Sequence, residues 1–185
     1  MIDELLLPTF TQMLRALSGW LDKADAHAAS RGEDGNGVMA LRLAPDMFPL
    51  SSQVAFACFQ AREGVHRLRG EAVPEEALRQ RNAGAEAVPM TLAEAKARIA
   101  ETIAALAAPG AAGGAGDMPV ALDLPNGMVF DMTGHTYVRD WLLPQFYFHL
   151  VVAYSILRAN GVALGKADLV PHMFAYLRPG TAPAG

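Results

Sequence analysis

The sequence predicts an all-α protein, a four-helix bundle with a small β-hairpin inserted before the last helix. Apolar residues recur at spacings of three and four along four segments, as they do in helices that bury one face. One short segment instead alternates apolar and polar residues, which is typical of paired strands. The chain has 185 residues, 52% of them hydrophobic, which suits one domain with a substantial core.

The first helix is expected from about Thr9 to Ser30, because Pro8 suits a first turn and Gly32 opens a glycine-rich break. A connector from Val38 to Pro45, which carries a few apolar anchors, follows that break. The stripe that the first helix is expected to bury consists of Phe10, Met13, Leu17, Trp20, Ala24 and His27.

The second helix is expected from about Pro49 to Arg69, with Asp46 as a candidate cap just before it. Its buried stripe includes Cys58, which we interpret as a small core residue. Gly70 ends this helix. Residues 71–90 are polar and punctuated by proline, so an irregular segment is expected there.

Thr91 and Glu94 have the spacing of a capping box, which predicts a third helix to about Ala108. The alanine- and glycine-rich stretch from Pro109 to Gly116 is expected to be a surface linker. Apolar and polar residues then alternate on both sides of a Pro-Asn-Gly turn, which predicts a hairpin over about residues 119–132.

The last helix is expected from about Tyr137 to Asn160, with Thr133 or Thr136 as its cap. It is apolar almost all round, so we expect it to be the most buried of the four. Residues 1–177 are therefore expected to form a single domain, followed by a flexible tail over residues 178–185.

Composition and charge exclude several classes of function. The net charge of -4 disfavours a nucleic-acid partner. The stretch from Trp141 to Leu157 carries no charge, but a membrane span needs about 20 such residues, so no membrane partner is expected. The acidic N-terminus is unlike a signal peptide, and we expect a cytoplasmic protein. The single Cys58 excludes an intrachain disulfide.

Polar side chains on buried stripes are the candidates for a binding site. Gln145 and His149 lie one turn apart on the same face of the last helix, and His27 lies on the core stripe of the first. Imidazole binds divalent metals, and the carboxylate of Asp46 could complete such a site. Alternatively, His149 forms a hydrogen bond inside the core, His27 interacts with a helix dipole, and Asp46 is only a cap.

Several segments together resemble those of a known family: Pro8-Thr9-Phe10, Met13 to Leu17, Arg42 to Leu50 with Gln53, Leu143 to Leu150, Tyr154, Ile156 to Arg158, Asn160-Gly161 and Leu164 to Lys166. The resemblance spans roughly residues 5–169. The family that these segments resemble is bacterial, is catalogued as a domain of unknown function and is grouped with the DinB/YfiT-like four-helix bundles.

The resemblance implies a DinB-like fold and further properties of that group. Many members are regarded as metalloenzymes, many are dimers, and some are thiol-dependent transferases. Their metal site usually takes three histidines, two of them one turn apart on a late helix. Here Gln145 stands one turn before His149, and glutamine is a poor ligand for zinc, iron or nickel.

Two hypotheses about function follow. The first is a DinB-like bundle whose interior binds a small molecule or a divalent transition metal near His149, Gln145, Asp46 and His27. In that case His149 and His27 are the metal ligands, or His149 is a general base that Asp46 orients. The second is a non-catalytic homodimeric module, in which His149 is satisfied inside the core and exposed aromatic residues form the interface. The sequence leaves open whether the protein is an enzyme.

Overall fold

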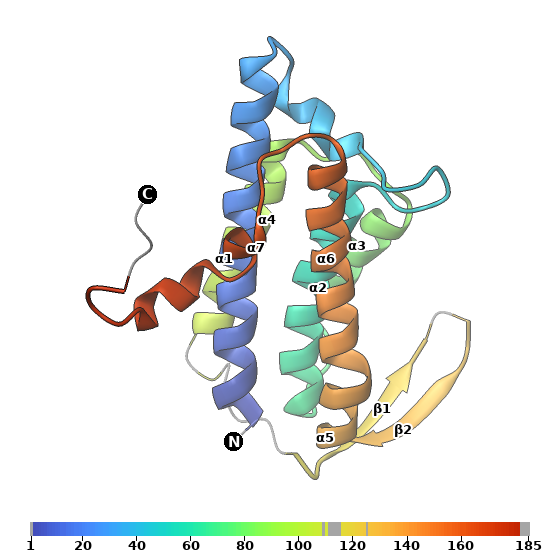
Figure 1. Cartoon of the computed structure of the whole chain (residues 1–185). Coiled ribbons are helices and arrows are strands. Elements are labelled where there is room, and N and C mark those ends of the chain that lie inside the picture. Colours follow the sequence, from blue (N-terminus) through green and yellow to red (C-terminus); the bar gives the residue numbers. More distant parts are fainter. Residues whose placement is uncertain (1, 109, 111–115, 125, 182–185) are drawn as a thin grey trace.

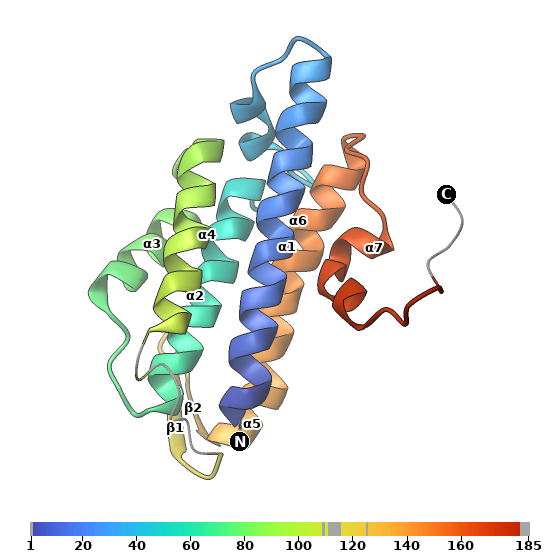
Figure 2. The ribbon, with the colours of Figure 1, turned by 90° about the vertical axis from the view of Figure 1, so that its left-hand side faces the viewer.

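The computed structural model describes residues 2–108, 110, 116–124 and 126–181 (Figure 1). Four long helices lie side by side as a bundle: α1 (Ile2–Ser30), α2 (Leu50–Leu68), α4 (Leu92–Ala107) and α6 (Leu143–Ala159). Helix α2 packs against α4 and α6, and α1 packs against the same two helices (Figure 2). The predicted helical bundle is thereby confirmed.

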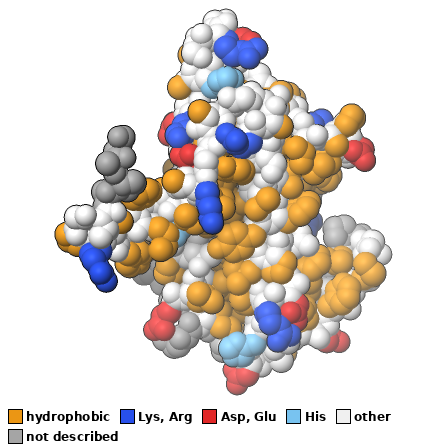
Figure 3. Space-filling model, viewed as in Figure 1, with side chains coloured by type: hydrophobic (Ala, Val, Ile, Leu, Met, Phe, Trp, Pro, Cys, Tyr) orange, Lys and Arg blue, Asp and Glu red, His pale blue; other side chains and the backbone are white. Residues whose placement is uncertain are grey.

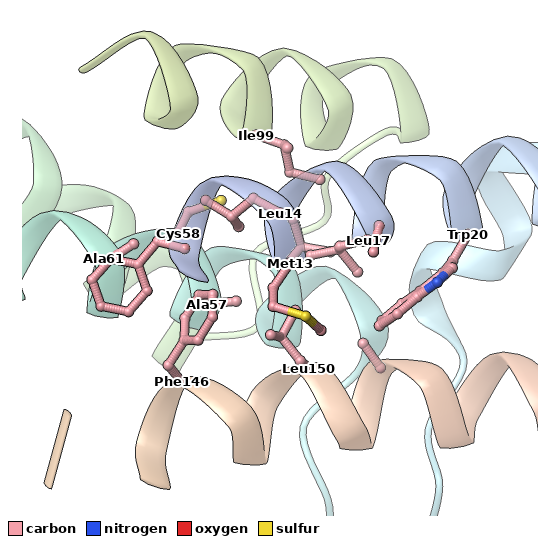
Figure 4. Packing of buried hydrophobic residues seen from close by; sticks show 14 of the residues in the cluster. Met13, Leu14, Leu17, Trp20, Ala57, Cys58, Ala61, Ile99, Phe146 and Leu150 are labelled. Carbon is pink, nitrogen blue, oxygen red and sulfur yellow. The ribbon is translucent and has the colours of Figure 1, made fainter. Parts of the chain in front are cut away.

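The core draws side chains from all four long helices (Figure 4). Phe10 and Phe146 meet edge to face across α1 and α6, with ring centroids 4.7 Å apart. Burial of such large apolar side chains supplies most of the favourable free energy of folding. The labelled core residues are Met13, Leu14, Leu17, Trp20, Ala57, Cys58, Ala61, Ile99, Phe146 and Leu150.

Helix α1 begins at Ile2, so the predicted start at Thr9 is wrong. Pro8 lies inside the helix, close enough to its N-terminal end that little of the hydrogen-bond ladder is lost. Leu6 is only 1% exposed, and its burial stabilises the additional turn. The Thr9 hydroxyl donates to the Leu5 carbonyl at 2.6 Å in the same region.

A second correction concerns residues 71–90, where the structure has the helix α3 (Glu75–Ala85) packed on α2. Its contact side holds Ala77 and Gly84, both buried. A Cβ atom on Gly84 would lie 3.0 Å from the Cβ of Ala55, so glycine permits the close approach. Because this helix buries small residues, its sequence lacks the stripe of large apolar residues that indicates a helix.

Asp46 is not the cap of α2, contrary to the expectation. The N-cap position is Pro49, and no side chain caps the helix there. Instead, the Leu50 amide donates to the Leu41 carbonyl at 2.9 Å, so the connector backbone satisfies the helix end. The connector itself contains the short helix η1 (Gly35–Ala40), which buries Val38 and Met39.

The predicted hairpin is confirmed as two antiparallel strands, β1 (Pro119–Asp123) and β2 (Val129–Thr133), with Val120 opposite Met132. Arg67 of α2 fastens it to the bundle. Its guanidinium donates to the Ala121 carbonyl at 2.8 Å and to the Asp123 carboxylate at 2.7 Å.

The last helical stretch is continuous from α5 (Gly134–Tyr137) through a π-helical turn, η2 (Val138–Leu142), into α6. Thr133 caps it in a capping box with Thr136. Pro144 has no amide hydrogen for an α-helical bond, and the π turn ends just before it, with the Leu143 amide bonded to the Val138 carbonyl.

The expectation that the last helix is the most buried is wrong, because one side of α6 stays exposed. Tyr147, Phe148 and Val151 are 39%, 54% and 49% exposed on it. Figure 3 is viewed as Figure 1, in which α6 lies on the near side, and it shows hydrophobic side chains gathered along the middle of that face of the molecule. Among the described residues, no helix is long and apolar enough to cross a membrane.

After α6, the helix α7 (Lys166–Leu169) returns to α1, where the Trp20 indole donates to the Asp168 carbonyl at 2.7 Å. The short helix η3 (Pro171–Tyr176) then projects from the bundle (Figure 1). The expected linker falls mostly outside the described residues, as does the end of the expected tail, whose described residues 178–181 are exposed.

Candidate functional site

The structure brings two of the four predicted site residues together. His149 and Asp46 line one cavity of about 460 Å³. The complete lining comes from α2, α3, α6 and the connector: Asp46, Met47, Phe48, Gln53, Phe56, Phe59, Gln60, Arg81, Phe148 and His149. Gln145 is not part of this lining, although it lies one turn from His149.

The structure does not bring His27 and His149 together. His27 lines a different cavity, of about 730 Å³, where the end of α1 meets Asn160 and Val162. It is half-buried, and its imidazole lies close to Gly161. The two histidines therefore belong to different parts of the bundle.

Four phenylalanine side chains belong to the wall of the His149 cavity. The rings of Phe48 and Phe56 meet edge to face, with centroids 5.3 Å apart. Phe56 and Phe148 also contact the imidazole of His149, at centroid distances of 4.9 and 5.3 Å. A wall of this kind favours flat, apolar molecules over strongly hydrated ones.

Gln53 orients the imidazole of His149. Its amide nitrogen donates to the Phe48 carbonyl at 3.2 Å, which leaves its Oε1 facing His149 Nδ1 at 2.9 Å. Because an amide oxygen only accepts, Nδ1 must carry the hydrogen of the neutral ring. The other nitrogen, Nε2, is then left with its lone pair.

Burial keeps His149 uncharged at neutral pH. The surrounding apolar side chains lower its pKa from 6.5 to about 4, because a desolvated imidazolium is costly. Gln53 is only 2% exposed, so the hydrogen bond that holds the ring is protected from water. His149 therefore presents a fixed, neutral hydrogen-bond acceptor rather than a positive charge.

Gln60 contributes a second polar group to the cavity. Its side chain is 8% exposed, and its buried Oε1 has no hydrogen-bond partner among the described residues. An unsatisfied buried carbonyl costs roughly 1–3 kcal/mol relative to a paired one. This oxygen itself has almost no accessible surface, so a molecule in the cavity does not reach it.

Two opposite charges complete the lining. The Arg81 guanidinium of α3 lies 5.3 Å from the ring centroid of Phe59, a cation–π contact, and also donates to Asn82 Oδ1. Asp46 is exposed on the connector. With His149 neutral, these formal charges balance, which disfavours a strongly charged ligand.

The residues of the cavity do not fit the metal centre that the resemblance implies. His149 and Asp46 are the only lining residues of the usual metal-binding types, and His149 Nδ1 is already bonded to Gln53. Throughout the part of the chain that the structure describes, no three His, Cys, Asp or Glu side chains are grouped so that they could hold a metal ion.

Sequence reasoning missed three of the polar groups. Gln53 and Gln60 are seven residues apart and therefore lie two turns apart on one side of α2. Polar residues within a stretch that is otherwise buried could have indicated both of them as site residues. Gln53 also belongs to a segment that carries the family resemblance. Arg81 left no such signal, because α3 itself was not predicted.

Comparison with known proteins places this fold in a family. Residues 3–170 match the family described as "Domain of unknown function (DUF1993)". The chain belongs to the DUF1993 family. This DUF1993 chain is also similar to the crystal structure of a DinB family member protein from Shewanella denitrificans, with 32% sequence identity and a TM-score of 0.77. That match covers 99% of this chain and 96% of the other. No curated protein matches the chain significantly.

Proposed function

We propose that this DUF1993 protein binds a small, largely apolar molecule in the cavity between α2, α3 and α6. The volume of about 460 Å³ lies within the range of small-molecule sites. Aromatic walls with a few fixed polar groups are the usual composition of such sites, and both features are present here.

The observation that carries the proposal is the neutral imidazole of His149, which Gln53 holds in a cavity with four phenylalanine side chains in its lining. Its Nε2 has no hydrogen-bond partner among the described residues. A bound molecule that donates to this nitrogen would supply one and would gain affinity from it.

The proposal is one of binding and not of acid–base catalysis. A general base works best when its pKa lies near the operating pH. The pKa of His149 is held at about 4 by burial, so this imidazole is a weak base at neutral pH. The amide of Gln53, and not the carboxylate of Asp46, orients it.

The proposal can be tested by NMR on the labelled protein, titrated with a set of small aromatic molecules. We expect shift changes that cluster at His149, Phe56 and Phe59. Phe148→Ala should weaken binding, because it removes part of the wall. Tyr147→Ala, on the neighbouring exposed position outside the lining, is the matched control. Absence of shifts at the cavity, or clustering around His27, would contradict the proposal.

The exposed side of α6 supports a second candidate function, pairing with another copy of the chain. Tyr147 and Val151 present apolar surface there, and a two-fold axis would bring this same face of two copies together. Sedimentation equilibrium should then show a dimer that Val151→Glu dissociates. A monomer at the highest soluble concentration would exclude this candidate.

A further inference from the structure

We infer that the cavity selects a neutral, planar aromatic molecule that carries a hydrogen-bond donor, such as a hydroxyl or ring N–H group. The inference rests on the proposed function and adds the chemical class of the ligand. It depends on one acceptor, His149 Nε2 of α6, in a lining that also contains four phenylalanine side chains.

Two successive hydrogen bonds that involve Gln53 of α2 make Nε2 of His149 a hydrogen-bond acceptor. The Phe48 carbonyl accepts from the Gln53 amide nitrogen, and Gln53 Oε1 accepts from His149 Nδ1. Reversing the tautomer would place two acceptors against each other at 2.9 Å, which is unfavourable. In the described part of the chain Nε2 has no hydrogen-bond partner, so its lone pair is available to a ligand.

A ligand hydroxyl or N–H group would pair with His149 Nε2. A ligand oxygen without a hydrogen would instead be repelled by its lone pair.

The charges of the cavity do not favour an anion. Arg81 is the cationic side chain in the lining, and it is engaged by the Phe59 ring and by Asn82 Oδ1. The carboxylate of Glu63 also acts on it electrostatically. Asp46 adds a negative charge to the same lining. A carboxylate ligand would therefore lose its hydration without gaining a free cationic partner.

Three probes of similar shape separate these features: 2-naphthol, 2-methoxynaphthalene, in which the donor is blocked, and 2-naphthoate, which is charged. We expect 2-naphthol to bind about tenfold more tightly than 2-methoxynaphthalene in isothermal titration calorimetry, since only 2-naphthol donates a hydrogen bond to a buried acceptor. 2-Naphthoate should bind most weakly.

A variant assigns the preference to His149. His149→Asn keeps an amide donor near the position of Nδ1 but lacks Nε2. It should reduce the preference for 2-naphthol severalfold while leaving the affinity for 2-methoxynaphthalene nearly unchanged. Gln145→Asn, one turn before His149 and outside the lining, is the matched control.

A readout independent of binding is the ¹⁵N spectrum of the imidazole, which should show hydrogen on Nδ1 of His149. Hydrogen on Nε2 would overturn the inference. Equal or tighter binding of 2-methoxynaphthalene or 2-naphthoate would also overturn it, while leaving the proposed function intact. If none of the three probes binds but other small aromatic molecules shift the cavity signals, the inference alone fails. If nothing shifts those signals, the proposed function fails with it.

Discussion

At the scale of single residues, burial without a charged partner decides what His149 can do. Among the residues that the structure describes, no carboxylate is hydrogen-bonded to its ring, and its Nδ1 is bonded to the amide of Gln53. Desolvation therefore acts alone on its pKa and favours the neutral form. A buried neutral histidine accepts hydrogen bonds from a ligand, whereas a histidine paired with a carboxylate would act as a base or carry a positive charge.

The stability of the protein should fall in mild acid because of His149. In the unfolded chain this group titrates near 6.5, but in the folded protein near 4. Between these values the unfolded state binds more protons, so stability decreases as the pH is lowered through this window, by at most about 1.4 kcal/mol per pH unit.

Urea unfolding of wild type and His149→Asn at a series of pH values measures this effect. Since asparagine does not titrate, the variant should show a shallower loss between pH 6.5 and 4, and the difference between the two profiles isolates His149 from the carboxyl groups. Parallel profiles would show that burial does not hold this imidazole neutral.

Cys58 should be chemically silent in the folded protein. It is 1% exposed, and burial raises the pKa of its thiol to about 11. The thiolate population at pH 8 is then about a hundredfold lower than at the ordinary value of 9.0, in addition to the steric protection. We expect no reaction with a thiol-specific disulfide reagent until urea unfolds the chain. Rapid native-state labelling would contradict the packing described for α2.

At the scale of elements, α2 is the central helix of the fold. It packs against α3, α4 and α6, and its Gly64 meets the π-helical turn before α6. A Cβ atom on Gly64 would lie 2.5 Å from Cδ2 of Leu142, a side chain that is fully buried. The spacing of these two elements therefore depends on the absence of a side chain at this position.

Gly64→Ala should destabilise the protein, although alanine is the better helix former. Overpacking against Leu142 costs roughly 1–3 kcal/mol, which exceeds the gain of about 1 kcal/mol in helix propensity. Gly19→Ala on α1 is the matched control, because nothing lies within 4 Å of its added Cβ. The control should raise the unfolding midpoint in urea. Stabilisation of both variants would mean that Leu142 moves aside freely.

At the scale of the whole molecule, a polar network joins the hairpin to the bundle. Glu63 is buried on α2 and pairs with Arg67 at 2.9 Å, and Arg67 reaches Asp123 of β1 at 2.7 Å. Burial raises the pKa of Glu63 despite this ion pair. Arg67 therefore balances the charge of the buried Glu63 carboxylate and also holds β1 against the bundle.

Arg67→Met should cost about 3 kcal/mol in urea unfolding, because it leaves Glu63 buried without its partner. Amide exchange over β1 and β2 should accelerate more than exchange in α2. Arg139→Met is the control, since its pair with Asp140 is exposed and screened by solvent, so its loss should have a much smaller effect. Equal effects of the two substitutions would show that the network does not anchor the hairpin.

Periodic burial explains how much of the fold was predictable. The stripes that include Phe10, Val54 and Ile99 are buried as their spacing predicts, and the alternation around Gly127 produced the hairpin. Helix α3 was missed because it buries Ala77 and Gly84, which are too small to form a recognisable stripe. The start of α1 was missed because Pro8 was expected to precede the helix. The helix instead tolerates this proline close to its N-terminal end.

By itself, the sequence determined the class of fold and the hairpin, and it carried the family resemblance and the choice of His149 and Asp46 as candidates. Only the tertiary structure decided that these two line one cavity, that His27 lines another, and that Gln53 orients the imidazole. The physical reason is that periodicity reports which face of a helix is buried, but not which face of another helix it meets. The cavity exists because α3 and the connector close over α2 and α6, and that packing follows from contacts between residues far apart in the chain.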